Sequence, residues 1–384
     1  MKRIAILGST GSIGCQTLDV VRRHPDKLEV VALAAGTRVK ELLEQATKFG
    51  VKRLAIGDAD AAAKADLPEG AECGVGPQAV IEMAVDSEAD IVVNSLVGAA
   101  GLEASYETLR AGKVLALANK ESLVVGGDLI IPLSKETTVE LGREALMPID
   151  SEHGAIYQCL IGENAREVER LWVTASGGPF RGRKLGELGD ITPAQALAHP
   201  TWNMGAKITI DSSTLMNKGL EIIEAHHLFG MAYDRISVVV QPQSAIHSMV
   251  EFTDGSVKAH LGTTDMRIPI QFALSYPERW DAPVPPMDFT KLGRLEFEAP
   301  DTETFRCLAL ARHAGEVGGT LPCAMNAANE VAVAAFLEGR GSYLGIAECV
   351  EAVMLAHDVQ AVESISQLQE VDAWARSCAK DHIR

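Results

Sequence analysis

The sequence predicts an α/β fold in three parts: an N-terminal Rossmann-like domain with a doubly wound parallel sheet, a central α+β domain and a C-terminal helical bundle. Three observations support this prediction. Short apolar segments alternate with helical patterns over residues 1–150, closely spaced strand patterns continue to about residue 285, and helical patterns return beyond about residue 300. The chain has 384 residues, which is too long for one core of ordinary size, so several domains are expected.

The strands of the first domain are predicted where short runs of apolar residues occur. These runs are Ile4–Leu7, Val30–Ala34, Arg53–Ile56, Ile91–Asn94 and Val114–Ala118. Helices are predicted between them at Gln16–Arg23, Val39–Phe49, Gln78–Ala84 and Leu102–Ala111. Strands that are apolar along most of their length are buried on both faces, which is typical of a parallel sheet covered by helices.

The centre and the end of the chain have different patterns. Central strands are predicted at LWVTASGG, KITIDSS, RISVVVQPQS, HSMVEFTDGSV and KAHLGTTD. A helix is expected after KITIDSS, capped by Asp211, Ser212 or Ser213 and ended by Gly230. The Pro-rich segment 281–289 indicates a linker. The terminal bundle is predicted from helices at Thr302–Ala314, Leu321–Glu338, Tyr343–Leu355 and Val371–Ala379.

Composition excludes several classes of function. The net charge of −17 argues against a nucleic-acid partner, which would need a basic face, but a locally basic pocket for a phosphorylated substrate remains compatible. No apolar run is long enough for a membrane span, so none is expected. Because a strand pattern begins within three residues of the N-terminus, no leader is expected either. The seven cysteines form no C-x-x-C pair. A cytoplasmic protein is expected.

The segment ILGSTGSIG predicts a phosphate-binding turn. Gly8, Gly11 and Gly14 fall between the first predicted strand and the first predicted helix. Glycines there allow backbone N–H groups to approach a pyrophosphate, and the helix N-terminus adds a favourable dipole. The spacing is G-x-x-G-x-x-G, and a purely structural turn is the alternative.

The end of the second predicted strand favours NADP over NAD. An NAD site usually has an acidic residue there, which binds the ribose hydroxyls. This strand instead ends in Gly36, Thr37 and Arg38. Arg38 could pair with a 2′-phosphate and Thr37 could donate a hydrogen bond, unless Arg38 only caps a solvated helix start.

Polar residues also follow the strand at Val114–Ala118. Asn119, Lys120, Glu121 and Ser122 come directly after it. Ligands of open α/β sheets bind beyond the carboxyl ends of the strands, so Lys120 could contact a substrate or a phosphate. A solvated loop is the alternative.

The segment MPIDSEH raises the question of a metal. In an extended segment Asp150 and Glu152 would lie on one face, and a divalent cation would relieve their repulsion. Two hard oxygen ligands suit Mg²⁺ or Mn²⁺, whereas a zinc site would recruit His153. From this pair alone a solvent-exposed turn is as good an interpretation.

Three residues on the helix after KITIDSS could complete such a site. Asn217 and Glu221 are four residues apart and share a face, and Lys218 is adjacent to that face. Asn217 and Lys218 could bind phosphate, and Glu221 could supply a third metal oxygen. An ordinary exposed Lys–Glu pair is the alternative.

Two further segments indicate anion binding and closure. Ser176 precedes two glycines at a strand end, where exposed backbone N–H groups can form an anion nest. Residues 198–207 contain His199, Trp202 and Met204 between a proline and a glycine. Such a segment is typical of a mobile lid that excludes water, although Trp202 could also be a buried anchor.

The order of these motifs resembles one family over essentially the whole chain. GSTGSIG, ANKESL, PIDSEH, SGGPFR, HPTWNMG, DSSTLMNKGLE and MNAANEVAVAAF are similar to the motifs of 1-deoxy-D-xylulose-5-phosphate reductoisomerases. The resemblance implies an NADPH-dependent enzyme that rearranges and reduces deoxyxylulose phosphate to 2-C-methyl-D-erythritol 4-phosphate in non-mevalonate isoprenoid synthesis. It also implies a required divalent cation (Mg²⁺, Mn²⁺ or Co²⁺) and a homodimer.

The resemblance also implies the roles of individual residues. It assigns the metal to Asp150, Glu152 and Glu221. It assigns the substrate to Lys120, Ser151, Glu152, Ser176, His199, Trp202, Met204, Ser212, Asn217, Lys218 and Glu221, with the phosphate on Ser176, Ser212, Asn217 and Lys218. It assigns the cofactor to Thr10, Gly11, Ser12, Ile13, Gly36, Thr37, Arg38, Asn119, Glu121 and Gly205, and the glycine turn adds Gly8 to this set. The catalytic set is Lys120, Asp150, Glu152, His199 and Glu221. Thr37, Thr201 and Asn203 are positions that we expect to vary.

The expected domains follow from the same resemblance. They are an NADPH-binding domain at 1–150, a catalytic and dimerisation domain at 151–285 with the lid at 198–207, a linker at 286–300 and a C-terminal helical domain at 301–384. Two alternatives remain: another NADP-dependent oxidoreductase acting on a small phosphorylated or semialdehyde substrate, which would not need three carboxylates, and a non-catalytic dinucleotide sensor.

Overall fold

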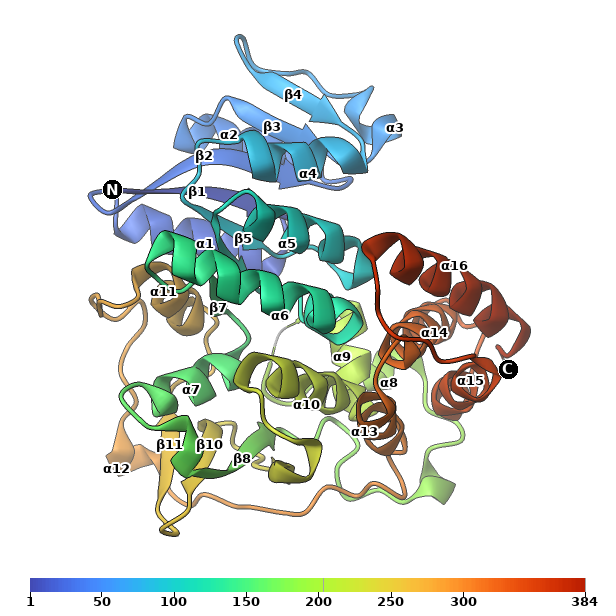
Figure 1. Cartoon of the computed structure of the whole chain (residues 1–384). Coiled ribbons are helices and arrows are strands. Elements are labelled where there is room, and N and C mark those ends of the chain that lie inside the picture. Colours follow the sequence, from blue (N-terminus) through green and yellow to red (C-terminus); the bar gives the residue numbers. More distant parts are fainter. Residues whose placement is uncertain (203, 384) are drawn as a thin grey trace. The chain divides into compact units, whose positions relative to one another are not determined.

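The computed structural model describes residues 1–202 and 204–383, and most of its helices and strands are labelled in Figure 1. The chain divides into two compact units, each built from segments that are distant in sequence. The first unit comprises Met1–Ser122, Ile130–Gly154 and Asp265–Pro285. The second comprises Leu123–Leu129, Ala155–Thr264 and the chain from Pro286 onward.

The first unit is built on a parallel sheet of seven strands in the order β4-β3-β2-β1-β5-β6-β7. The strands are β1 (Lys2–Leu7), β2 (Leu28–Ala35), β3 (Arg53–Ile56), β4 (Glu72–Val75), β5 (Ile91–Asn94), β6 (Val114–Leu117) and β7 (Leu146–Pro148). The five predicted strands are confirmed. The two edge strands β4 and β7 were not predicted, because they are short and β4 is largely exposed. The strand order reverses beside β1. In open α/β sheets, ligands bind beyond the carboxyl ends of the strands at such a point.

Helices connect these strands and pack on the sheet. They are α1 (Ser12–Arg23), α2 (Val39–Phe49), α3 (Ala59–Ala62), α4 (Pro77–Asp86), η1 (Gly98–Ala100) and α5 (Gly101–Arg110). The core on the α4 side is rich in alanine, including Ala5, Ala32, Ala34 and Ala55, which are fully buried. Small side chains let α4 lie close to the sheet. Helix α11 (Arg267–Ser275) joins this unit from later in the chain and packs on α1, where the Arg267 guanidinium lies 3.0 Å from an Asp19 carboxylate oxygen.

Two helices contain residues of both units. Helix α6 (Glu121–Leu141) has non-helical backbone angles at Gly126, and its residues 123–129 belong to the second unit. Helix α7 (Ser151–Leu160) begins in the first unit and continues in the second. Within the second unit, a Cβ on Gly127 would lie 2.4 Å from the ring of His227, so only glycine fits at this close approach of α6 to α10.

The second unit contains a mixed sheet in the order β11-β10-β8-β9. Its strands are β8 (Val168–Ala175), β9 (Ile236–Val240), β10 (Ile246–Phe252) and β11 (Val257–Leu261). Strands β8 and β9 are parallel, while β10 is antiparallel to both of its neighbours, β8 and β11. The short elements of this region are η2 (Ala165–Glu167), η3 (Leu185–Glu187), α8 (Pro193–Ala196) and η4 (Tyr233–Arg235). The α+β character predicted for the centre of the chain is confirmed.

The prediction that KITIDSS forms a strand is wrong. This segment is helix α9 (Ala206–Ser213). Its β-branched residues favour a strand locally, but burial of Thr209, Ile210 and Ser213 in the helix outweighs that weak preference. The predicted cap of the following helix is also wrong, because Asp211, Ser212 and Ser213 lie within α9. Helix α10 (Met216–Phe229) instead follows Leu215, which has a left-handed φ of 61°, and ends before Gly230 as predicted.

The C-terminal part of the chain is helical, as predicted. Its helices are α12 (Phe289–Leu292), α13 (Cys307–Val317), α14 (Leu321–Leu337), α15 (Tyr343–Ala356) and α16 (Ile365–Asp381). They share one hydrophobic core with α9, α10 and the mixed sheet. A Cβ on Gly219 would lie 2.3 Å from Ala311 Cβ, which shows how closely α10 and α13 pack. None of the helices in the described part of the chain is long and apolar enough to cross a membrane.

Candidate functional site

The predicted phosphate turn joins β1 to α1. The Gly8 and Ser9 N–H groups donate to the Ala34 carbonyl of β2 at 2.9 and 2.8 Å, and the Gly11 N–H donates to the Gly8 carbonyl at 2.9 Å. Gly11 is then the N-cap of α1, with no side-chain cap. The first N–H groups of a helix lack partners inside that helix, so the N–H groups of Ser12 and Ile13 can serve an anion.

The turn needs glycine at two positions. Gly8 has a φ of +82°, and a Cβ there would lie 2.7 Å from the Ser95 carbonyl oxygen. A Cβ on Gly14 would lie 2.4 Å from the Gly8 carbonyl oxygen and 2.5 Å from Ser9. Side chains at these positions would push α1 away from the turn. Thr10 is buried and Ser12 is exposed at the helix start.

The end of β2 carries the three residues that were predicted to select NADP. Gly36, Thr37 and Arg38 are all exposed, and Arg38 is the N-cap residue of α2 without a side-chain capping bond. The guanidinium is therefore not engaged in the helix cap that was its alternative role.

The loop after β6 holds Asn119, Lys120 and Glu121, all of which are buried. The Asn119 amide donates to the Leu96 and Gly98 carbonyls at 3.1 and 2.9 Å and to the Glu121 carboxylate at 3.1 Å. Its carbonyl oxygen accepts from the Ser122 N–H at 3.1 Å. The solvated loop that the sequence left open is thereby excluded, and Asn119 fixes the backbone from which Lys120 projects.

Lys120 lies against the acidic segment that follows β7. Its ammonium nitrogen is 2.5 Å from Asp150 Oδ2. The Ser151 hydroxyl donates to Glu152 Oε2 at 2.5 Å, and the Glu152 N–H donates to Asp150 Oδ1 at 3.1 Å. Four predicted site residues are thus brought together at the carboxyl ends of two neighbouring strands.

One expectation about this segment is wrong. Asp150 and Glu152 do not share a face of extended chain, because α7 begins at Ser151 and places Glu152 in its first turn. His153 is fully buried, and its Nδ1 lies 3.4 Å from Asp150 Oδ1. The histidine therefore packs behind the aspartate within the same unit.

In the second unit, His199 connects two serines. Its Nε2 lies 3.0 Å from the Ser176 hydroxyl and 3.1 Å from the Ser212 hydroxyl. Ser176 follows β8, and Ser212 is on α9, so the histidine joins the sheet to the helix. The Ser176 oxygen also accepts from the Gly178 N–H at 3.3 Å, in the turn that was predicted to bind an anion.

The hydrogen bonds of His199 define its protonation. Its Nδ1 accepts from the Thr201 and Trp202 N–H groups at 3.2 and 2.9 Å, so the proton of the neutral ring is on Nε2. Burial and the positive charge of Lys218 both lower the pKa of His199 below its usual 6.5. The neutral ring therefore donates toward the two serine oxygens at pH 7.

The start of α10 presents the remaining predicted residues. The Asn217 amide and the Lys218 ammonium each donate to a different oxygen of Glu221. All three side chains are buried, with Lys218 6% and Glu221 1% exposed, so the exposed Lys–Glu pair that the sequence left open is excluded. A buried lysine and carboxylate are stable only when they are paired with each other or with a ligand.

The predicted lid, 198–207, follows α8 and ends in the first turn of α9. Trp202 and Met204 are half-buried, Gly205 is the exposed N-cap of α9, and Asn203 lies outside the described residues. The Trp202 ring is 6.3 Å from the ring of His247, which sequence reasoning passed over. His247 is a single histidine in an apolar strand, β10. A histidine at such a position is most often a buried packing residue, so nothing in the sequence indicated a role in the site. Burial is the main cause that lowers the pKa of His247.

The fold and these groups define a class of protein. Beyond the carboxyl ends of β1, β2, β6 and β7, the first unit gathers a glycine turn, an exposed arginine, and a lysine paired with a carboxylate. This arrangement is typical of a nucleotide-dependent oxidoreductase. The second unit adds serines, a neutral histidine and a buried lysine.

Comparisons with known proteins agree with this class. The family model of 1-deoxy-D-xylulose 5-phosphate reductoisomerase matches residues 4–127, and two models of its C-terminal domains match residues 146–229 and 261–378. The chain belongs to the 1-deoxy-D-xylulose 5-phosphate reductoisomerase family. A curated relative of that name from Chloroherpeton thalassium is 50% identical over 384 residues, which cover 99% of this chain and 98% of the relative.

Solved structures give the same result. The chain is 43% identical to the 1-deoxy-D-xylulose 5-phosphate reductoisomerase of Zymomonas mobilis in complex with NADPH, with a TM-score of 0.88 over 99% of this chain and 98% of that one. It is 40% identical to a reductoisomerase in complex with NADPH, fosmidomycin and magnesium, with a TM-score of 0.91 over 100% of this chain and 98% of that one. The fold, the enzyme class and the family predicted from the sequence are confirmed.

Proposed function

We propose that the chain rearranges 1-deoxy-D-xylulose 5-phosphate and reduces the product to 2-C-methyl-D-erythritol 4-phosphate, with NADPH and a divalent cation. One observation carries this proposal: the chain combines a nucleotide-binding turn, a serine–histidine–serine cluster and buried lysine–carboxylate pairs. It is also 50% identical, over 99% of its length, to a relative of that name. Reductoisomerases of this family bind NADPH and magnesium in solved structures.

Asp150, Glu152 and Glu221 are the proposed metal ligands. Each is a hard oxygen donor, and the cations Mg²⁺ and Mn²⁺ prefer such ligands, with Co²⁺ as a further option. The donor set fits, because Asp150 and Glu221 each already balance a positive charge, that of Lys120 and of Lys218. When bound, the cation would polarise the keto and hydroxyl oxygens of the substrate, while NADPH would supply the hydride.

The proposed phosphate subsite consists of Ser176, Ser212, Asn217 and Lys218. Two hydroxyls, an amide and an ammonium can together donate to several phosphate oxygens. His199 orients the serines as a neutral donor through Nε2, which leaves their hydroxyl protons available for the phosphate. Binding energy from this remote group can then hold the reacting carbons in place and favour closure of the lid with Trp202 and Met204.

Lys120 is the stronger candidate for moving a proton near the reacting oxygens. Its ammonium lies against Asp150, one of the proposed metal ligands, whereas both nitrogens of His199 are engaged. Ser151 and Glu152 complete this group on the first unit, with Ser151 as a substrate contact. The proposed catalytic set is therefore Lys120, Asp150, Glu152 and Glu221, with His199 acting through the phosphate.

The proposed NADPH site is the β1–α1 turn with the ends of β2 and β6. Gly8, Thr10, Gly11, Ser12 and Ile13 would contact the pyrophosphate, and Arg38 would pair with the 2′-phosphate beside Gly36 and Thr37. Asn119, Glu121 and Gly205 would complete the site toward the nicotinamide. We further propose a homodimer, which is supported by the family resemblance. A cytoplasmic location is proposed because the seven cysteines are free, as in a reducing compartment.

One assay tests the function. NADPH oxidation is followed by absorbance with 1-deoxy-D-xylulose 5-phosphate, before and after EDTA is added, and again after Mg²⁺ is restored in excess over EDTA. We expect turnover that EDTA abolishes and Mg²⁺ restores. Metal-independent NADPH oxidation with a semialdehyde, which is reduced to its alcohol, would instead favour another oxidoreductase. NADPH binding without turnover of any substrate would favour a sensor.

A further inference from the structure

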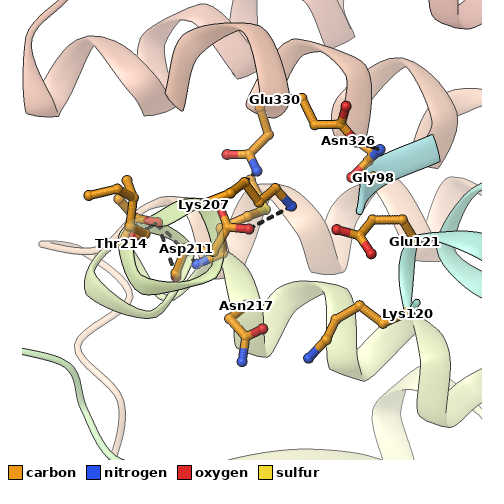
Figure 2. Close-up of polar contacts among 12 residues, drawn as sticks. Gly98, Lys120, Glu121, Lys207, Asp211, Thr214, Asn217, Asn326 and Glu330 are labelled. Atoms are coloured by element: carbon orange, nitrogen blue, oxygen red, sulfur yellow. Dashed lines mark hydrogen bonds and ion pairs between the residues drawn. The ribbon is translucent and has the colours of Figure 1, made fainter. Parts of the chain in front are cut away.

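Asp211 carries a buried charge that the proposed reaction does not use. It is 1% exposed on α9. Its Oδ2 lies 2.7 Å from the Lys207 ammonium, one turn earlier on the same helix, and its Oδ1 accepts from the Asn329 amide of α14 at 2.9 Å. Figure 2 shows Lys207 and Asp211 facing one another across this turn of the helix.

The bond to Asn329 joins segments that are 118 residues apart. Asn329 is fully buried. Within the part of the chain that the structure describes, its side-chain amide donates this hydrogen bond to Asp211. It belongs to MNAANEVAVAAF, a sequence motif to which the proposed function gives no role. A buried carboxylate is stable only with its partners in place, so Lys207 and Asn329 fix Asp211 in one position.

The same short helix carries part of the proposed phosphate subsite. Successive residues of a helix point about 100° apart, so Asp211 faces α14 while Ser212 faces a different direction, where its hydroxyl lies 3.1 Å from His199. Helix α9 begins within the predicted lid, whose last residue, Lys207, lies in the first turn of the helix. Asp211 thus connects the end of the lid and the Ser212 hydroxyl to α14. The Tyr343 hydroxyl of α15, which donates to the Ser213 carbonyl at 2.6 Å, holds the other end of α9.

We propose that Asp211, held by Lys207 and Asn329, is a positioning residue that sets the Ser212 hydroxyl for the substrate phosphate and anchors the closing lid. The inference rests on the proposed function, because it deepens the role of that phosphate subsite. Without the anchor, α9 can rotate or shift on α14, and Ser212 loses its fixed distance to His199. The chemistry at the reacting carbons does not depend on Asp211, so the effect falls on substrate binding.

The test is a set of steady-state measurements on full-length variants. For Asp211→Asn we expect the KM for 1-deoxy-D-xylulose 5-phosphate to rise about tenfold or more, with kcat within about threefold and the KM for NADPH unchanged. The double variant Asp211→Asn/Asn329→Asp exchanges amide and carboxylate across the same contact, and it should recover most of the lost KM. An unchanged substrate KM in a folded Asp211→Asn protein, or no recovery in the exchange variant, would overturn the proposal.

The matched control is Thr320→Val. Thr320 is also fully buried in this unit, and its hydroxyl is 2.8 Å from His357 Nε2, away from α9. We expect it to lower the thermal midpoint without a change in the substrate KM. If Asp211→Asn does not fold, Lys207→Gln serves in its place, because Lys207 is partly exposed, and it should raise the substrate KM in the same direction; no rise would count against the proposal.

A second readout is independent of activity. Amide hydrogen exchange of the free protein should become faster in residues 206–213 of Asp211→Asn and stay unchanged there in Thr320→Val. If the wild-type protein fails to turn over the substrate, the proposed function fails, while the exchange measurement still decides whether Asp211 holds α9. Equal exchange of α9 in both variants and the wild type would refute the anchor.

Discussion

The burial and the ion-pair partners of single residues distinguish a functional site from a solvated surface. From the sequence alone, a metal site and a solvated turn were nearly equally good interpretations of Asp150 and Glu152. Lys218 and Glu221 could likewise have formed an ordinary exposed ion pair. In the structure, Lys218 and Glu221 are buried and paired, and Lys120 lies against Asp150. Because a buried charge without a partner is strongly destabilising, such pairs exist in a fold only where they are compensated by each other or by a ligand. The roles assigned to these residues stay proposals.

Glu221→Gln tests the metal assignment at the scale of one side chain. The change removes one negative charge from the proposed ligand set and leaves its volume nearly constant. We expect kcat to fall at least about a hundredfold, because the metal would stabilise the transition state by several kcal/mol, with the KM for NADPH nearly unchanged. Steady-state kinetics with Mg²⁺ measure this. Glu351→Gln, a partly exposed glutamate paired with Arg306, is the control and should retain normal kcat. Near-normal turnover of Glu221→Gln would contradict the assignment.

His227 predicts a pH dependence of stability. Burial is the main cause that lowers its pKa from 6.5 to about 4. The unfolded chain therefore binds more protons than the folded chain between these two values, so the free energy of unfolding decreases as the pH falls from 6.5 toward 4. The loss attributable to this residue is on the order of 3 kcal/mol.

Urea unfolding at several pH values measures the His227 effect. In His227→Gln, which cannot titrate, the free energy of unfolding should decline less steeply over the same range. His313→Gln is a suitable control, since it replaces another histidine of the same unit outside the contact with Gly127. An identical slope in wild type and His227→Gln would contradict the assignment to this residue.

At the scale of elements, most of the secondary structure follows from local sequence. The parallel strands of the first unit and the terminal helices were predicted from apolar runs and helical periodicity. The segment KITIDSS was not, because its β-branched residues favour a strand when taken alone. As α9 it places Asp211 toward α14 and Ser212 toward His199, an arrangement that an extended segment would not give. The edge strands β4 and β7 were also not predicted. Strand β4 is largely exposed and shows no clear apolar pattern, and β7 has three residues, which are too few to show a period.

The contact between α10 and α13 gives a prediction at this scale. Gly219→Ala would place a methyl group 2.3 Å from Ala311 Cβ, so the helices would have to separate. We expect a loss of about 1–3 kcal/mol of unfolding free energy, together with a higher substrate KM, because α10 carries Asn217 and Lys218. Chemical denaturation and kinetics measure both.

Two further variants test whether the close approach at Gly219 causes the loss of stability. Ala311→Gly combined with Gly219→Ala should recover part of the stability, since the second change makes room for the first. Gly186→Ala is the control, because its Cβ would meet nothing within 4 Å and its φ is not positive. A stability of Gly219→Ala equal to that of Gly186→Ala would show that the close approach does not limit the packing.

At the scale of the whole molecule, the boundaries of the units do not follow the order of the chain. Residues 265–285 belong to the first unit, and the terminal helices share a core with the mixed sheet. The sequence gives a separate helical domain at 301–384, and this division stays a prediction. Composition and periodicity indicate local structure, but they do not indicate which distant segments pack into the same core.

Truncation at residue 300 tests that division. Leu308, Ala311, Leu321, Ala324 and Met325 belong to the core that also contains Leu220 and Val173. Without these helices that core is open, so we expect residues 1–300 to lose the cooperative unfolding of the second unit while the first unit still folds. Limited proteolysis and near-UV circular dichroism measure this outcome. A truncated chain with a folded mixed sheet would show that residues 301–384 form an independent domain.

The sequence by itself determined the fold class of this protein, its family and the residue types of its site, because apolar periodicity, glycine spacing and motif order are local properties of the chain. The tertiary structure alone decided that the lysines and carboxylates are buried in pairs, that His199 is neutral between two serines, and that Asp211 ties α9 to α14. Burial, and with it protonation and pairing, depends on which segments pack together. Such segments can be distant in sequence, as Asp211 and Asn329 are, which lie 118 positions apart.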